Sequence, residues 1–273
     1  MVILIFWVRR RRVLDVRGFM GLELAMLAVA TLLSFIIFFT GQVHLALGAA
    51  LIAIYLLYLG ISSTRESEEP ELVGAAKLIG SMSTGRRRSV VALLFLYAAA
   101  VILMAAEPFV ESLVETGVEL GIDEFILIQW VAPLASESPE IIVAVLFSLR
   151  ANAVAGITTL VSAEVNQLTL LVGSTVVIFS ISAGQALNFP LDSRQSAEFL
   201  LMSAVSVFAV LLIAPRLISW RAGLVLLGLF IAHLFFVDTG QRLIFAYIYL
   251  GLAAGLLVLN RRRFRSLFGG ASQ

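Results

Sequence analysis

The sequence contains no cysteine and only two histidines, His44 and His233. Disulfide bonds, thiolate metal sites and cysteine nucleophiles are therefore excluded, and two histidines are too few for a histidine metal centre. Charged residues are scarce as well: they make up 14% of the 273 residues, whereas 60% are hydrophobic and the mean hydropathy is +1.03. Because no soluble globular composition approaches these values, the sequence predicts a polytopic membrane protein.

Signatures of catalysis and of nucleotide binding are also absent from the sequence. It has no GxxxxGK[ST] phosphate-binding pattern and no recognisable pairing of a nucleophile with a base. We therefore expect no enzyme activity, no bound cofactor and no nucleic-acid partner. An intramembrane hydrolase that uses a pair of carboxylates is the enzymatic alternative, and cation flux without hydrolysis would exclude it.

Apolar segments long enough to cross a bilayer predict an all-α bundle of about eight transmembrane helices. If every segment crosses, only two of the 19 lysines and arginines, Arg194 and Arg242, lie on one face of the membrane. By the positive-inside rule, both termini and the polar loop at 63–87 are expected to be cytoplasmic, in what we interpret as a prokaryotic plasma membrane. The segments are 18–40, 43–62, 88–106, 124–149, 153–183, 197–214, 221–237 and 242–260.

The chain resembles itself at an offset of 177 residues. At this offset "LDVR" at 14–17 lies over "LDSR" at 191–194, and the similarity continues through two apolar segments in each copy, over 14–60 and 191–237. The first copy is expected to begin on the cytoplasmic face and the second on the opposite face, so the two copies are inverted. Inverted repeats are typical of secondary transporters.

The same offset suggests a role for the N-terminal segment. Subtracting 177 from the pair of segments at 124–183 gives positions that end near residue 6. The apolar stretch "MVILIF" at 1–6 therefore takes the place of the end of a first copy of that pair. We expect the chain to be either the C-terminal part of a longer protein or a subunit that works beside a second half, including a second copy of itself.

The most unusual stretch is "APLASESPE" at 132–140, which carries two carboxylates within an otherwise apolar segment. An ionised residue at the centre of a membrane costs about 2.5 to 3.5 kcal/mol, so Glu137 and Glu140 are expected to face protein or water and to have a function. On a helix they share a face with Pro133 and Ser136. Carboxylate, hydroxyl and proline-freed carbonyl oxygens suit hard cations such as Na⁺ and Ca²⁺.

The next apolar segment contains a second polar run, "VSAEVNQLT" at 161–169. Ser162, Asn166 and Thr169 share one helical face. Glu164 lies about 200° round the helix from both Ser162 and Asn166, so it is expected to face a different helix or cavity. Hydrogen bonding between helices is the alternative interpretation of these polar residues.

The stretch 135–173 resembles one α-repeat of the calcium/cation antiporter superfamily, the sodium/calcium exchanger fold. That repeat reads approximately GTSxPE, an apolar helix, a small-residue turn and then GSNxxN or GSNxxD. By position, Glu140 matches the principal cation-binding carboxylate of the motif and Ser136 matches its threonine. Ser162 matches the first serine of the second motif, and Asn166 matches its last Asn or Asp.

The sequence departs from the family motif at four positions, which leaves the transported ion open. Glu137 replaces the motif serine, and Glu164 is an additional acid. Pro133 replaces the small residue whose carbonyl is a ligand, and Ala163 replaces the first asparagine. Ser138, Glu164 and Pro133 are further candidates for the cation site. A second carboxylate in the motif favours either proton coupling, because like charges promote uptake of a proton, or binding of Ca²⁺.

The resemblance also implies a domain organisation. Residues 1–62 would be the end of a first exchanger half, two transmembrane helices that follow a missing first α-repeat, and 63–87 would be a cytoplasmic loop. Residues 88–240 would be the second half, with its α-repeat at about 107–183, and 241–273 would add a transmembrane helix and a basic tail. In the family the cation site takes ligands from both repeats, so this chain is expected to hold about half of a site.

The function implied is secondary-active antiport, in which Ca²⁺ or another cation is exchanged for Na⁺ or H⁺ by alternating access. The cation is expected to bind at Glu140, Glu137, Ser136, Ser162 and Asn166, with Glu140, Glu137 and Asn166 as metal ligands. The expected partners are membrane lipid, the transported ions and the second half. The alternatives are a non-transporting subunit or degenerate half-exchanger, and a channel, which would lack stoichiometric coupling.

Overall fold

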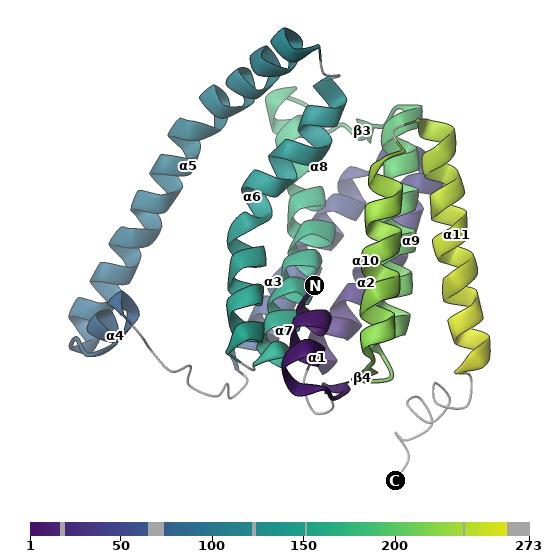
Figure 1. Ribbon diagram of the computed structural model, residues 1–273. Helices are drawn as coiled ribbons and strands as arrows, with labels where there is room; N and C mark the ends of the chain where they lie inside the picture. Colours follow the sequence, from purple (N-terminus) through teal and green to yellow (C-terminus); the bar gives the residue numbers. More distant parts are fainter. Residues whose placement is uncertain (17–19, 65–73, 122–123, 151, 237, 261–273) are drawn as a thin grey trace. The chain divides into compact units, whose positions relative to one another are not determined.

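The structure is a computed structural model of the whole chain, and it describes all residues except 17–19, 65–73, 122–123, 151, 237 and 261–273 (Figure 1). The chain forms two units, one made of Met1–Thr64 with Pro139–Gln273 and the other of Arg65–Ser138. α6 (Glu124–Leu149) contributes its first part to the second unit and its last part to the first unit.

The first unit consists of helices joined by very short strands. Its other helices are α1 (Val2–Arg10), α2 (Gly21–Thr40), α3 (Leu45–Ser63), α7 (Ala153–Asn166), the π-helix η1 (Gln167–Leu171), α8 (Val172–Ser182), α9 (Ser193–Ile213), α10 (Trp220–Leu234) and α11 (Thr239–Leu259). Its strands are β1 (Leu14–Asp15), β2 (Gln42–Val43), β3 (Phe189–Pro190) and β4 (Leu217–Ile218). The second unit contains α4 (Ala75–Gly80) and α5 (Thr84–Leu120) besides the first part of α6.

Every apolar segment expected from the sequence coincides with helical structure. Among the described residues, six helical stretches are long and apolar enough to cross a membrane: α2, α3, α5, α7 to α8, α9 and α11. α10 is apolar but shorter. The all-α fold is therefore confirmed, whereas the total of eight spans stays a prediction. α5 runs to 37 residues, beyond the expected segment 88–106, so it is about 55 Å long and exceeds a hydrocarbon core of roughly 30 Å.

Polar side chains fix where several of these helices begin. The Asp192 carboxylate accepts a hydrogen bond from the backbone N–H of Gln195, whose side chain in turn accepts one from the backbone of Asp192, so α9 starts with a capping box. Asn152, Ser219 and Asp238 cap the first turns of α7, α10 and α11. These caps supply partners to backbone donors that the first turn of a helix cannot satisfy itself.

The short strands reveal an inverted repeat. β1 pairs antiparallel with β4, and β2 pairs antiparallel with β3. β3 begins 175 residues after β1, at 189 against 14, and β4 begins 175 residues after β2, at 217 against 42, so this shift converts one strand pair into the other. The strands therefore tie the two ends of α2 to the two ends of α9, which run in opposite directions.

The structural shift of 175 residues is two fewer than the offset found in the sequence. The reason lies in the role of the matched aspartates: Asp192 caps α9, whereas Asp15 belongs to β1. Strand hydrogen bonds fix the register of the repeat, and the short "LD-x-R" similarity is displaced from that register.

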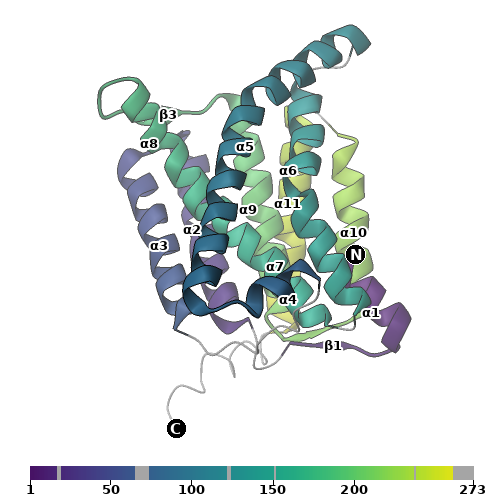
Figure 2. The same cartoon turned by 90° about the vertical axis from the view of Figure 1, so that its left-hand side faces the viewer.

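The repeat extends to the helices that pack beside the central pair. α8 packs against α3, as Figure 2 shows, and α1 packs against α10. Each contact depends on a glycine, Gly48 in α3 and Gly223 in α10, and these two are again 175 residues apart. A Cβ atom built on Gly223 would lie 3.1 Å from the side chain of Ile3 in α1. α1 thus has the same place beside α10 that α8 has beside α3.

Buried polar pairs join the central helices. The hydroxyl oxygens of Ser34 in α2 and Ser203 in α9 are 2.6 Å apart and buried. Arg242 of α11 is 2% exposed and reaches the carboxylate of Glu198 in α9 through Nε and Nη1, each at 3.2 Å. One of the two arginines that depart from the expected charge distribution is therefore buried against a carboxylate.

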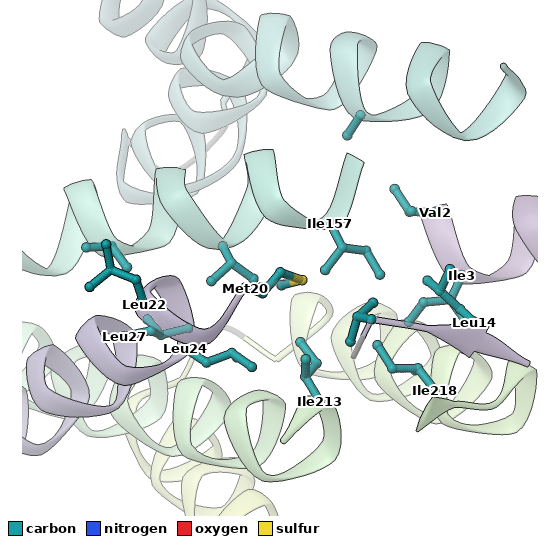
Figure 3. Packing of buried hydrophobic residues seen from close by; sticks show 14 of the residues in the cluster. Val2, Ile3, Leu14, Met20, Leu22, Leu24, Leu27, Ile157, Ile213 and Ile218 are labelled. Atoms are coloured by element: carbon teal, nitrogen blue, oxygen red, sulfur yellow. The ribbon is translucent and has the colours of Figure 1, made fainter. Parts of the chain in front are cut away.

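The largest apolar cluster of the first unit forms where α1, β1, α2, α7 and β4 meet. Figure 3 shows Val2 and Ile3 of α1 close to Leu14, Ile157 and Ile218, all of them buried. In lipid, where helices gain little from leaving water, such close packing is the main source of helix association. This cluster anchors α1 to the rest of the unit.

The contact between α8 and α3 gives a test of this packing. A Cβ atom on Gly173 would lie 2.6 Å from the carbonyl oxygen of Gly48 and 2.8 Å from Cγ1 of Ile52, so Gly173→Ala forces the helices apart. We expect a loss of about 1–3 kcal/mol in stability, measured as thermal unfolding in detergent. Gly60→Ala in α3 is the control, because a Cβ there meets nothing within 4 Å and alanine favours helix. Equal effects of the two variants would contradict the packing argument.

Candidate cation site

The first candidate motif, at 132–140, lies in α6, which continues as an α-helix through Pro139. Ser136, Glu137 and Ser138 end the second unit, and Glu140 follows in the first. The side chain of Pro133 lies outside the described residues. The structure therefore places Glu140 relative to α7, and the other residues of the motif only within their helix.

Two candidate ligands have buried oxygens that lack a partner. Oε2 of Glu140 and Oδ1 of Asn166 are inaccessible to solvent and have no hydrogen-bond partner among the described residues. Leaving a buried oxygen without a partner costs roughly 1–3 kcal/mol of folding free energy, and more when the group is charged. A third such atom, Oε2 of Glu23, lies in the first turn of α2, where the helix dipole favours a negative charge. The oxygens of Glu140 and Asn166 lie outside the first turn of their helices, and a cation would satisfy them.

Close contact between α6 and α7 relates the levels of these ligands. A Cβ on Gly156 of α7 would lie 2.8 Å from the carbonyl oxygen of Ala144 and 3.3 Å from Oγ of Ser148, both in α6. The two helices run in opposite directions from their connection (Figure 1). At 1.5 Å per residue, Glu140 lies about 6 Å and Ser162 about 9 Å along the helices from this contact. The carboxylate of α6 and the hydroxyl of α7 are thus at similar levels.

Ser162 of α7 also contacts α3. Its Oγ lies 2.8 Å from the phenol oxygen of Tyr58, whose side chain is 6% exposed. Either hydroxyl can be the donor. If Ser162 donates, its hydrogen points to Tyr58 and its lone pairs stay available to a cation. The sequence does not single out Tyr58, because a tyrosine in an apolar helix resembles an interfacial residue.

Glu164 faces away from Ser162, as the helical geometry predicts. Its Oε1 accepts a hydrogen bond of 2.9 Å from Oγ of Ser206 in α9. Both residues line a cavity of about 290 Å³ whose remaining walls, from α1, α2, α7, α9 and α10, are apolar. Ser206 is a second residue that the sequence does not single out, because its contact with Glu164 joins positions 42 residues apart.

A π-helix follows directly after Asn166. η1 covers Gln167–Leu171, and the hydroxyl of Thr169, 0% exposed, donates to the carbonyl of Val165. π-bulges within α-helices occur frequently at functional sites. The polar run at 161–169 therefore coincides with a change of helix type.

Among the described residues, no group of three or more His, Cys, Asp or Glu side chains could hold a metal. The candidate ligands offer oxygens of different kinds: the carboxylate of Glu140, the hydroxyl of Ser162 and the amide of Asn166. Mixed oxygen ligands of this kind are typical of Ca²⁺ and Na⁺ sites rather than of transition-metal sites.

An inverted helix repeat, helices that can cross a membrane and partnerless oxygens on helices α6 and α7 define the class of membrane cation transporters. The chain belongs to the sodium/calcium exchanger protein family. The sequence pattern of this family matches residues 90–237, which are over half of the chain. This family consists of transporters and is not a class of enzymes.

A solved structure shows the same fold. The crystal structure of the H⁺/Ca²⁺ exchanger CAX is 38% identical in sequence and superposes with a TM-score of 0.92. The match covers 98% of this chain and 68% of that chain. No curated protein matches the sequence. The expected membership of the calcium/cation antiporter superfamily and the inverted-repeat exchanger fold are therefore confirmed.

The hydrogen bond between Tyr58 and Ser162 can be measured with a double-mutant cycle. We expect Tyr58→Phe and Ser162→Ala to couple by about 0.6 kcal/mol, typical of hydrogen bonds between membrane helices, in thermal unfolding of the purified protein. Tyr55→Phe is the matched control, since Tyr55 lies in the same helix with its ring 6.1 Å from that of Tyr58. It should show no coupling with Ser162→Ala, and additivity of Tyr58→Phe with Ser162→Ala would disprove the contact.

Proposed function

We propose that this protein is part of a secondary-active antiporter that exchanges Ca²⁺ or another hard cation for H⁺ or Na⁺ by alternating access. The cation binds at Glu140, Ser162 and Asn166. Ser136 and Glu137 add ligands through the sequence motif, and Ser138, Pro133 and Glu164 are further candidates near it.

The observation that carries this proposal is the pair of buried oxygens without partners, Oε2 of Glu140 and Oδ1 of Asn166. Inside a membrane protein such atoms are tolerated where they serve ion binding. An amide and a carboxylate together provide a site that favours a cation and leaves room for exchange, because few of its ligands are charged.

The counter-ion is H⁺ rather than Na⁺ in our proposal. Glu137 adds a carboxylate three residues before Glu140, on the same face of an ideal helix. When both are ionised they repel each other, so loss of the bound cation favours uptake of a proton. The relative that is 38% identical is an H⁺/Ca²⁺ exchanger, which supports the same assignment.

The site is completed by a second α-repeat in this proposal. α1 occupies beside α10 the place that α8 occupies beside α3, and α8 is the end of the α-repeat in this chain. α1 is accordingly the end of a first α-repeat, which supplies the remaining ligands from the same polypeptide or from another subunit. Residues 1–62 and 88–240 then belong to the two exchanger halves, joined by the segment 63–87.

The orientation follows from the distribution of positive charge. Lysines and arginines gather at 9–17, 65–88 and 261–265, which one face of the membrane would share if every apolar segment crosses. The positive-inside rule then places both termini in the cytoplasm. The burial of Arg242 against Glu198 supports this orientation, because a paired arginine inside the bundle does not count as a loop charge.

Loss of the Glu140 carboxylate tests the proposed function. In proteoliposomes that contain the protein in its purified assembly, an outward H⁺ gradient should drive Ca²⁺ uptake. Glu140→Gln should lower this uptake on the order of 100-fold, because truncating a buried charged ligand costs several kcal/mol. Glu119→Gln, which removes an exposed carboxylate of α5, should retain it. Absence of exchange by the wild-type assembly, or unchanged uptake by Glu140→Gln, would exclude the proposal.

The role of Glu137 is tested separately by the choice of counter-ion. Glu137→Ser restores the residue of the family motif. We expect Ca²⁺ uptake by this variant to depend several-fold less on pH, and Na⁺ to become a better driving ion. Uptake would be measured between pH 6 and pH 8, with gradients of H⁺ or Na⁺ imposed in turn. A pH profile identical to that of the wild type would show that Glu137 does not carry the proton.

A further inference from the structure

A cavity at the end of α1 has walls of a different chemistry from the cation site. Its volume is about 520 Å³, and it is lined by Phe6, Arg9, Arg10 and Arg12. Three arginines therefore border one space, and none of the described residues that line it is acidic. The rule that places positive charges on the cytoplasmic face accounts for the sidedness of these arginines, but not for their convergence on a cavity.

Two contacts hold the cationic wall in place. Nη1 of Arg9 donates a hydrogen bond of 2.6 Å to the carbonyl oxygen of Leu149, in the last turn of α6. Arg11 ends α1 in a left-handed conformation, with φ of 52°, and its guanidinium lies 4.5 Å from the ring centroid of Trp7. The backbone that carries Arg10 and Arg12 is thus fixed, while these two side chains remain exposed. Such preorganisation lowers the entropic cost of binding.

Two tryptophans lie close together near the arginines. The rings of Trp7 in α1 and Trp220 in α10 are 5.0 Å apart, and the guanidinium of Arg221 lies 5.8 Å from the ring of Trp220. Tryptophan is enriched where membrane meets water. We therefore expect the arginines that follow Trp7 in the sequence to lie at the height of phosphate groups. Phe6 adds an apolar side chain to the lining of the cavity.

We propose that this arginine cavity binds the headgroup of an anionic phospholipid. The guanidinium groups of Arg9, Arg10 and Arg12 hold the phosphate, since planar guanidinium suits phosphate oxygens. Phe6 contacts the start of an acyl chain. A free phosphate ion would use only the guanidinium wall, whereas a lipid also uses the apolar one. Because Arg9 also contacts the end of α6, a bound lipid stabilises the contact between α1 and the helix that carries Glu140.

The proposal is tested by binding of phosphatidylglycerol to the purified protein in neutral detergent, with bound lipids counted by native mass spectrometry. Phosphatidylglycerol should bind more tightly than phosphatidylcholine. The double variant Arg10→Gln/Arg12→Gln should bind it about 30-fold more weakly, since each arginine near a charged headgroup contributes about fivefold. Arg9 is left intact because its contact with Leu149 serves the fold.

Arg86→Gln/Arg87→Gln is the matched control, with the same loss of charge at exposed positions of α5. It should keep tight binding of phosphatidylglycerol, and thermal unfolding in phosphatidylcholine should show that both variants fold. Equal loss in the two variants, or equal binding of the two lipids by the wild type, would overturn the proposal. Millimolar inorganic phosphate at constant ionic strength should not displace the lipid, and displacement would assign the cavity to a free anion. These outcomes do not depend on cation exchange.

Discussion

A polar side chain inside a membrane has no water to bind, so it must find its partner on another part of the protein. This requirement joins the central helices of the chain. The hydroxyls of Ser34 and Ser203 meet where α2 and α9 cross, and Arg242 binds Glu198 to attach α11 to α9. Each pair fixes the position of one helix relative to the other. The glycine contacts allow α8 to pack closely against α3, and α1 against α10.

Two candidate ligands do not meet this requirement within the described residues. Glu140 and Asn166 each keep one buried oxygen without a partner, while the neighbouring Ser162 and Glu164 are both satisfied by hydroxyl groups of other helices. The two oxygens without partners suit an additional positive charge, which is the basis of the proposed cation site. The need of buried polar groups for partners therefore bears on both the fold and the proposed cation site. Paired polar groups join the helices, and unpaired oxygens remain for the cation.

Hydropathy and the two polar motifs carry much of this information in the sequence. They predict the helices and the candidate ligands, because lipid permits few structures and tolerates few buried charges. The inverted repeat was predicted from the similarity of the chain to itself. The strands of two residues are too short to leave a pattern, so the register of the repeat was two residues out. Tyr58 and Ser206 were not predicted either, since their roles depend on α3 and α9 lying beside α7. Contacts between distant segments have no local signature.

The π-helix has a consequence for how mutations along this segment are interpreted. An additional residue in one turn advances everything after it by about 100° around the axis. The helical periodicity of α7 therefore does not continue unchanged into α8. A single helical wheel for both helices would assign the residues of one of them to the wrong face. The π-helix lets one continuous helical stretch present the amide of Asn166 to the proposed cation site and, two turns later, Gly173 to α3. Ligand geometry and helix packing can thus change independently during evolution.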